Sequence, residues 1–381
     1  MKNLLVFAVS LILVSCCANN NSRQQLTAVP VGTIFPTDTL APPTEAVNIN
    51  TSTSETFSSR EDIEYRPFFD EWTRIHNLQP GCIAFDDNNQ IWSVFLEFKY
   101  FDGNSWNTIP TPEKFGEVWS CPHISKDGLI YFFYSARNST VTSLPRFDGK
   151  NWAFFDLPDY LSESMLKQTS MAMDASGHIW LGLQNCGDNS CLYRFDGTQW
   201  NEVSFPFSSI RSLSADQKGN LWIGGNSNTG IAHYDGKAWM FYATETLWPD
   251  GYSYGWNADT ASINVKIDFE GAVWAVLKGN DWVKINPAGK ITWYPVELEI
   301  ASDDSLTLYP DIHKRIWFIL NWELGYFDYD KTEIVSFQGL KKNALLAGSG
   351  FYISPDGDWW LVLSNGTQDE AGIYQYTPTK E

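Results

Sequence analysis

A motif that recurs at intervals of roughly 40 to 50 residues constrains this chain more than any other feature of its sequence. Each copy pairs an apolar residue with an aromatic residue that follows it directly. The seven pairs are Ile91-Trp92, Ile130-Tyr131, Ile179-Trp180, Leu221-Trp222, Val273-Trp274, Ile316-Trp317 and Trp359-Trp360. One β-propeller blade of four short strands has this length. The repeat therefore predicts an all-β chain with seven blades.

A turn signal precedes each aromatic pair. An Asp or Ser lies six residues before the aromatic, and a Gly or Asn lies three residues before it in every copy but one. The Asp and Ser residues are Asp86, Ser125, Asp174, Asp216, Asp268, Asp311 and Ser354. Such side chains accept a backbone N–H two residues on, and Gly or Asn tolerates the positive φ of a tight hairpin. Lys314 takes the Gly position in the sixth copy, where we expect a strained or different turn.

A second hairpin signal follows later in the first four copies. There Phe-Asp-Gly or Tyr-Asp-Gly precedes a tryptophan, and Asp-Gly between apolar runs is a strong hairpin signal. The four tryptophans are Trp106, Trp152, Trp200 and Trp239. Each copy therefore predicts strands a, b, c and d in that order, with turns between a and b and between c and d.

The seventh copy has no strand d of its own. Its strand c covers residues 373–376, and Glu381 ends the sequence shortly afterwards. Residues 72–75, ahead of the first copy, read Trp-Thr-Arg-Ile and compare with the strand d at 106–109. We expect this N-terminal strand to complete the last blade, because closure removes the exposed edges of an open stack of sheets. The predicted fold is a seven-bladed β-propeller over residues 61–381.

Residues 216–236 carry a resemblance to a known family. Residues 216–224 fit the pattern D-x-x-G-x-[IL]-W-[ILV]-G, and residues 230–236 fit G-[IL]-x-x-[FY]-D-G. This pattern resembles the two-component regulator propeller repeat, and the resemblance extends over nearly everything from Cys82 onward. The resemblance is specific for the fold; because such repeats occur both in sensor ectodomains and in secreted proteins, it implies no particular function.

The first fifteen residues have the layout of a signal peptide. Lys2 precedes an apolar run that ends at Val14, which is shorter than the roughly 20 residues of a membrane-spanning helix. The end of this run and the two residues after it, Leu13-Val14-Ser15-Cys16, resemble the bacterial lipobox. The resemblance implies that Cys16 carries a diacylglycerol and, on its new amino group, a further acyl chain such as palmitate. It also implies a cell-membrane or outer-membrane protein that faces away from the cytoplasm; an ordinary secretory signal is the alternative.

Residues 16–60 differ in composition from the repeats. They are built mainly from Asn, Ser, Thr, Pro, Gln and Ala, with Phe35 and Phe57 as their aromatic residues. Such a segment cannot bury enough apolar surface to offset its ordering entropy, so we expect a flexible linker. The formal net charge of -19 argues against nucleic acid as a partner and against adsorption to anionic lipid. We expect a monomer whose contact with the membrane is its N-terminal lipid.

Four cysteines remain besides the two at the lipobox. Cys82 and Cys121 lie ten residues before the aromatics of their copies, and therefore at the same repeat position. Cys186 and Cys191 flank a predicted hairpin between strands b and c. An exported chain favours disulfides, and of the three possible connectivities the pairing 82–121 with 186–191 is the local one.

Residues that would mark catalysis are sparse. The chain has five histidines, and it shows no zinc-binding helix motif, no nucleophile elbow and no phosphate-binding glycine loop. We therefore expect no metal, no cofactor and a binding protein rather than an enzyme. A propeller lyase or hydrolase is the alternative, and it would need acids or histidines clustered over the central channel.

Four of the 18 tryptophans are not required by the repeat. They fall in the connections from d to a or from b to c, which open on the same face, and Tyr252 and Tyr254 accompany two of them. The four are Trp119, Trp248, Trp256 and Trp322. Aromatic rings beside polar groups suit stacking on sugars or anchoring a partner protein. We predict a glycan or peptide ligand on this face; rings that only pin the loops, or a scaffold within an envelope complex, are the alternatives.

Overall fold

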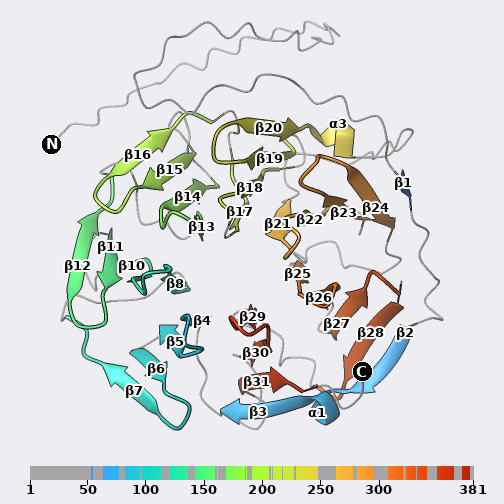
Figure 1. The fold of residues 1–381 in the computed structure, drawn as a ribbon, viewed down its shortest axis with the longest axis horizontal. Helices are drawn as coiled ribbons and strands as arrows, with labels where there is room; N and C mark the ends of the chain where they lie inside the picture. The colour runs from blue at the N-terminus through green and yellow to red at the C-terminus, as the bar shows by residue number, and fades with distance from the viewer. Residues whose placement is uncertain are drawn as a thin grey trace, which may run out of the picture. The chain divides into compact units, whose positions relative to one another are not determined.

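The structure analysed is a computed structural model, and all its described strands lie in the unit Leu40–Glu381. It describes residues 53–54, 63–76, 82–94, 97–112, 121–135, 142–158, 161, 169–184, 186, 191–205, 207, 209–216, 218–226, 229–247, 263–277, 281–295, 308–320, 323–331, 333–340, 350–363 and 371–377. Within this unit seven sheets follow one another around a ring (Figure 1). The predicted seven-bladed, all-β propeller is confirmed.

Each blade is an antiparallel sheet whose strands follow the order a, b, c, d. Blades 1 to 3 are β4 (Cys82–Phe85), β5 (Ile91–Val94), β6 (Phe98–Phe101) and β7 (Trp106–Ile109); β8 (His123–Ile124), β9 (Ile130–Tyr131), β11 (Thr142–Phe147) and β12 (Trp152–Asp156), with β10 (Tyr134–Ser135) beside β11; and β13 (Thr169–Met173), β14 (Ile179–Leu183), β15 (Leu192–Phe195) and β16 (Trp200–Val203). Blades 4 and 5 are β17 (Ser212–Ala215), β18 (Leu221–Gly224), β19 (Ile231–Tyr234) and β20 (Trp239–Tyr242); and β21 (Asn264–Ile267), β22 (Val273–Val276), β23 (Asp281–Ile285) and β24 (Ile291–Pro295). Blades 6 and 7 are β25 (Leu308–Pro310), β26 (Arg315–Leu320), β27 (Glu323–Asp328) and β28 (Glu333–Gln338); and β29 (Gly350–Ile353), β30 (Trp359–Leu363), β31 (Gly372–Tyr376) and β3 (Trp72–His76).

Strand a of every blade lies nearest the centre of the ring, and strand d lies at the outside (Figure 1). Because the strands of a blade are antiparallel, the a–b and c–d turns share one edge of the blade. The b–c and d–a connections share the opposite edge. We call these two sides of the ring the turn face and the loop face.

The a–b turns adopt the backbone conformation that the sequence predicts. Asn89 has a φ of 59°, and the equivalent glycines are also at positive φ. Lys314 adopts a φ of 62°, so the sixth turn has the same shape as the others and is the strained one of the two possibilities. Its side chain extends along the turn face, where Nζ lies 2.9 Å from a carboxylate oxygen of Asp330.

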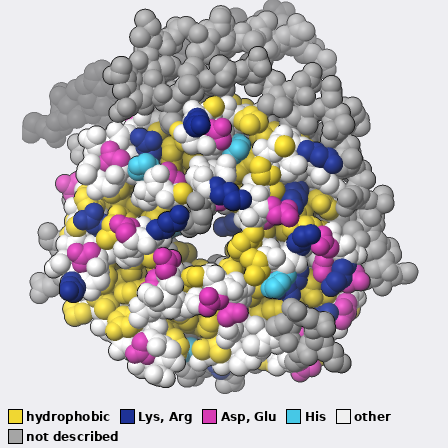
Figure 2. Space-filling model, viewed as in Figure 1, with side chains coloured by type: hydrophobic (Ala, Val, Ile, Leu, Met, Phe, Trp, Pro, Cys, Tyr) yellow, Lys and Arg dark blue, Asp and Glu magenta, His cyan; other side chains and the backbone are white. Residues whose placement is uncertain are grey.

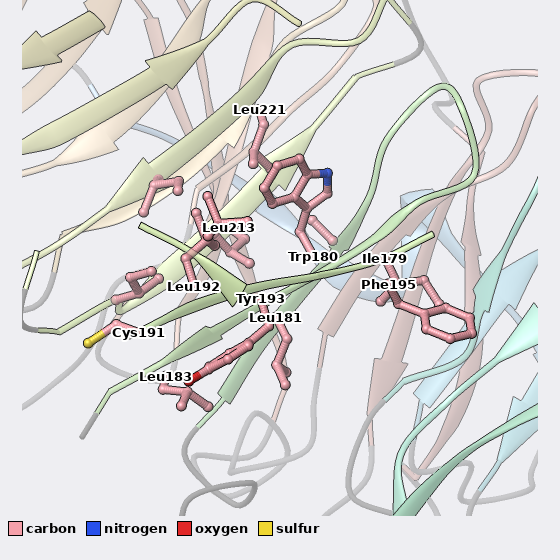
Figure 3. Close-up of a cluster of buried hydrophobic side chains, with 14 of the residues drawn as sticks. Ile179, Trp180, Leu181, Leu183, Cys191, Leu192, Tyr193, Phe195, Leu213 and Leu221 are labelled. Atoms are coloured by element: carbon pink, nitrogen blue, oxygen red, sulfur yellow. The ribbon is translucent and has the colours of Figure 1, made fainter. Parts of the chain in front are cut away.

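The hydrophobic core lies between the faces of neighbouring blades. Figure 3 shows one such layer, in which Trp180 and Leu192 of blade 3 pack with Leu213 and Leu221 at the start of blade 4. Five of the strand b aromatics are fully enclosed or nearly so: Tyr131, Trp180, Trp222, Trp274 and Trp317. The motif that reveals the repeat is therefore the motif that fills the layers between blades.

The N-terminal strand closes the ring. Trp72 of β3 pairs with Tyr376 of β31, and Trp72 is 2% exposed, which confirms the predicted closure. The short helix α1 (Phe68–Glu71) precedes this strand and buries Glu71. Oε2 of Glu71 accepts the phenol O–H of Tyr376 at 2.8 Å, and Oε1 lies 3.2 Å from Nη1 of Arg66.

Two further N-terminal strands were not predicted. β2 (Ile63–Pro67) pairs in parallel with β28, and β1 (Thr53–Ser54) pairs in parallel with β24, so blades 6 and 5 each gain a fifth, outermost strand. β1 lies within residues 16–60, the segment that the sequence predicts to be a linker. Among the described helices, none is long and apolar enough to cross a membrane.

Candidate functional site

The residues predicted to bind lipid or ligand lie outside the described part of the chain. This holds for Cys16 and for the aromatic group Trp119, Trp248, Tyr252, Tyr254, Trp256 and Trp322. The structure does show where their longest connection starts and ends. It leaves blade 4 through α3 (Thr244–Leu247) and returns at Ile263, and both Leu247 and Ile263 are buried in the same cluster. The ends of this connection are therefore anchored in the core on the loop face.

The structure forms both cysteine pairs that the sequence suggested. Cys82, at the start of the inner strand of blade 1, bonds to Cys121, which lies two residues before the inner strand of blade 2, and their Cα atoms are 5.1 Å apart. Cys186 and Cys191 close the b–c connection of blade 3, with their Cα atoms 5.3 Å apart. Both separations lie within the usual Cα range for a disulfide.

The inner strands bring together a set of residues that sequence reasoning did not single out. Each blade has one inner-strand residue that lies two positions before the Asp or Ser of its a–b turn. We call these seven positions the inner tier. They are Ala84, His123, Ala172, Ser214, Lys266, Tyr309 and Tyr352. The turn signals could have located this tier, because counting back from each Asp or Ser aligns the seven blades.

Serines link the inner strands of three neighbouring blades. Oγ of Ser170 accepts the backbone N–H of Leu213 at 2.8 Å. Oγ of Ser212 accepts the N–H of Val265 at 2.9 Å, and Oγ of Ser214 accepts the N–H of Ile267 at 3.1 Å. These bonds satisfy backbone groups at the free edge of each inner strand.

Four side chains of the inner tier are titratable: His123, Lys266, Tyr309 and Tyr352. Nζ of Lys266 lies 5.5 Å from the ring centre of Tyr309, over its face. The ring of Tyr309 in turn lies 5.1 Å from that of Phe351 in blade 7. The Tyr352 hydroxyl lies 4.0 Å from Sγ of Cys121, which belongs to the disulfide with Cys82.

Burial shifts the protonation of these groups. Desolvation, together with a smaller contribution from the charge of Lys266, lowers the pKa of His123 to about 4, so His123 is neutral at neutral pH. Desolvation also lowers the pKa of Lys266. Burial raises the pKa of Tyr352, and neighbouring Tyr309 adds to that shift. His123 and Tyr352 are therefore neutral hydrogen-bonding groups in the same tier as Lys266.

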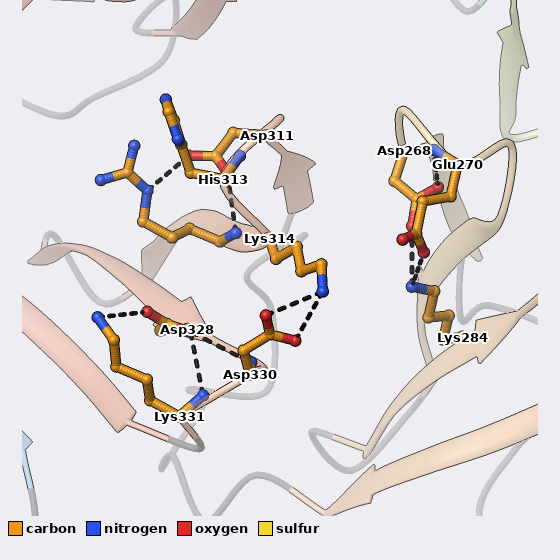
Figure 4. Close-up of polar contacts among 10 residues, drawn as sticks. Asp268, Glu270, Lys284, Asp311, His313, Lys314, Asp328, Asp330 and Lys331 are labelled. Atoms are coloured by element: carbon orange, nitrogen blue, oxygen red, sulfur yellow. Dashed lines mark hydrogen bonds and ion pairs between the residues drawn. The ribbon is translucent and has the colours of Figure 1, made fainter.

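A second polar cluster lies on the turn face of blades 5 and 6 (Figure 4). Lys284 Nζ lies 3.2 Å from Asp268 and 3.1 Å from Glu270, and it also lies 4.6 Å from the ring centre of Tyr329. Arg315 pairs with Asp311 at 2.7 Å. Each of these cations has a carboxylate partner, which is typical of a cluster that holds turns together.

The described residues hold no group of three or more His, Cys, Asp or Glu side chains that could bind a metal ion. The inner strands, which carry the inner tier, stand around the centre of the ring. Figure 2 shows that the ring is hollowed at its centre and that Lys and Arg side chains lie at the rim of the opening.

Comparisons with known proteins agree with this architecture. A family model described as two component regulator propeller matches residues 204–227, which include β17 and β18 of blade 4. No curated protein matches the chain.

Solved structures show the same fold at low sequence identity. A virginiamycin B lyase from Staphylococcus aureus is 16% identical with a TM-score of 0.58, and the match covers 81% of this chain and 99% of that chain. YCF48 bound to the D1 peptide is 14% identical with a TM-score of 0.51, over 83% and 99%. PorZ of Porphyromonas gingivalis, a surface component of the type-IX secretion system, is 14% identical with a TM-score of 0.53, over 78% and 46%. The chain is therefore a seven-bladed β-propeller in which residues 204–227 match the two-component regulator propeller family.

Proposed function

We propose that this chain is a lipid-anchored, extracytoplasmic β-propeller that binds a glycan or peptide ligand on its loop face without catalysing a reaction. The observation that carries the proposal is the difference between the two faces of the ring. The turn face consists of short turns that satisfy their own polar groups. The loop face receives connections of unequal length, the longest of which spans residues 243–263.

The turns leave little to offer a ligand. In the c–d turn of blade 1, Oδ1 of Asp102 accepts the N–H groups of Asn104 and Ser105 at 2.9 Å each. In that of blade 4, Oδ1 of Asp235 accepts two N–H groups in the same way. The tryptophans that no blade requires all fall in connections of the loop face, where rigid aromatic rings favour binding.

Binding is favoured over catalysis by the arrangement of titratable groups. General acid–base catalysis requires a proton donor and acceptor within hydrogen-bond reach of one substrate. Within the described residues, no carboxylate contacts His123 or Lys266, and the two side chains stand on blades 2 and 5. The similar structures include a lyase, a peptide-bound protein and a surface component, so the fold itself supports each of these roles.

The experiment is a ligand search followed by paired measurements on variants. The full chain is screened against a glycan array and a peptide library. Trp248→Ala, Trp256→Ala and Trp322→Ala are then measured for affinity and for melting temperature. We expect each loss of affinity to reach about 2 kcal/mol at a binding hot spot, with little change in melting temperature.

A matched control is Trp282→Ala, because Trp282 is fully buried between blades 5 and 6. That change should lower the melting temperature. If the three loop variants behave like Trp282→Ala and keep normal affinity, the rings pin the loops and the proposal is wrong.

A further inference from the structure

We infer that the central channel is an anion-binding site, in which Lys266 provides the positive charge for a single carboxylate or phosphate group. The inference is independent of the ligand proposed for the loop face. It rests on the place of Lys266, on its lack of a counter-charge, and on the hydrogen-bonding character of the residues around it.

Lys266 lies on one of the seven inner strands of the ring. It lies on β21, the strand of blade 5 nearest the ring centre, and its side chain is partly exposed (Figure 1). Its charge acts on His123, which stands on the inner strand of blade 2, on the far side of the ring. Both residues stand on inner strands of the ring, around the opening that Figure 2 shows at the centre.

Lys266 lacks the counter-charge that several other cations have. Six Lys and Arg side chains form ion pairs with Asp or Glu: Arg66, Lys99, Lys284, Lys314, Arg315 and Lys331. Within the described residues, the side chain of Lys266 contacts the ring face of Tyr309 and no carboxylate. A desolvated ammonium group with no counter-ion is costly, and a bound anion removes that cost.

The neighbours of Lys266 suit an anion rather than a cation. An ammonium group is purely a hydrogen-bond donor, and a phenol O–H and a neutral imidazole N–H also donate. Described inner-tier residues include no Asp or Glu, although the chain as a whole has a net charge of -19. The remaining tier positions carry the small side chains of Ala84, Ala172 and Ser214. This set provides charge-assisted hydrogen bonds to one oxyanion group.

The test titrates the full chain with inorganic phosphate and, separately, with acetate, while NMR follows the side-chain signals of the five histidines. An anion beside Lys266 offsets its charge, so binding should shift the His123 signal saturably and raise the pKa of His123. Binding of phosphate alone indicates a phosphate group as the natural ligand, binding of acetate alone indicates a carboxylate, and either result supports the site.

Variants locate the site. Lys266→Met should weaken binding by roughly tenfold or more, because a charge-assisted hydrogen bond is lost, and Lys266→Arg should restore much of it. Lys290→Met is the matched control, since Lys290 is exposed on a c–d turn of the same blade, and it should bind like the unmodified chain.

Two results overturn the inference. One is the absence of a saturable His123 shift with both anions in the unmodified chain, which needs no variant to interpret. The other is unchanged binding by a folded Lys266→Met chain, which would place the anions elsewhere. Both are separate from the loop-face proposal, because Trp248→Ala and Trp256→Ala should not alter phosphate or acetate binding.

Discussion

The carboxylate of Asp86 accepts the indole N–H of Trp92 through Oδ2 at 3.0 Å, while its Oδ1 accepts the backbone N–H groups of Asn88 and Gln90. One side chain therefore closes the a–b turn and satisfies a buried ring on the next strand. The same indole bond occurs in three more blades, at Asp174–Trp180, Asp268–Trp274 and Asp311–Trp317. This double role explains why the Asp of the a–b turn lies six residues before the Trp of strand b.

Replacing Asp86 with Asn should destabilise the propeller by roughly 1 to 3 kcal/mol, because a side-chain amide can turn its N–H₂ toward the indole N–H and leave a buried donor unsatisfied. The control is Asp235→Asn, at an exposed turn where Oδ1 accepts backbone N–H groups that an Asn also accepts. Urea unfolding measures both. Equal losses for the two variants would show that the indole bond contributes nothing.

The sequence could predict the turn role of these aspartates but not the indole acceptor. Asp216 has the same spacing to Trp222, yet its Oδ2 accepts the side-chain amide of Asn220 instead. Asn220 in turn bonds Nε2 of His233, whose ring stacks on Trp222 at 4.0 Å. The partner of Asp216 thus depends on a histidine from the adjacent strand c, which the local pattern does not include.

Repetition decided how much of the fold was predictable. The seven blades and the closing strand at residue 72 follow from aligned motifs, because similar residues fill equivalent packing positions in each blade. β1 and β2 lie outside the repeat and pair in parallel with the outer strands of blades 5 and 6, so no motif of the repeat predicts them. The inner tier was missed for the opposite reason: it lies within the repeat, but its residues differ from blade to blade. The predictions for Cys16 and the loop tryptophans remain predictions.

Because β3 closes the ring, replacing Trp72 should destabilise the propeller more than replacing Trp106, which has the equivalent position in blade 1. Trp72 and Trp106 both begin a strand d, but Trp72 is buried and its ring lies 5.1 Å from Tyr376 and 5.5 Å from Trp317. Trp72→Ala should cost about 3 to 5 kcal/mol. Trp106→Ala should cost less, because Trp106 is partly exposed. Thermal melts compare the two variants. A smaller or equal loss for Trp72→Ala would contradict the role of β3 in closing the ring.

The two disulfides should differ in their contribution to stability. Cys82–Cys121 closes a loop with a sequence separation of 39, against 5 for Cys186–Cys191. The loss of chain entropy in the unfolded state then gives roughly 4 kcal/mol for the first and about 2 kcal/mol for the second. Two double-alanine variants each keep one disulfide, and the change in melting temperature on reduction measures the bond that remains. A larger change in the chain that keeps Cys186–Cys191 would reverse this order.

Acid should destabilise the propeller through buried histidines. Burial lowers the pKa of His233 to about 4, against the attraction of Asp235 and Asp216, whereas an unfolded histidine titrates near 6.5. The unfolded state therefore binds the proton first, so stability is constant above about pH 6.5 and falls as the pH drops toward 4. Each pKa unit of difference is worth roughly 1.4 kcal/mol.

His233→Gln should reduce this acid loss, even if the variant melts lower at pH 7. His313→Gln is the control, because His313 is exposed on the turn face and its removal should leave the slope unchanged. Melting temperatures between pH 7 and pH 4.5 provide the comparison. An identical slope for the unmodified chain and His233→Gln would show that another group accounts for the acid sensitivity.

The lipid anchor is tested at Cys16, which the lipobox resemblance predicts to be the first residue after cleavage. Cys16→Ala removes the sulfur that would carry the diacylglycerol, so the variant should lack lipid and stay unprocessed by the lipoprotein peptidase. Cys17→Ala is the matched control, since it changes a neighbouring cysteine and leaves the predicted acceptor in place. Detergent-phase partitioning and the mass of the mature N-terminus distinguish them. Unchanged processing and partitioning of that variant would exclude Cys16 as the attachment point.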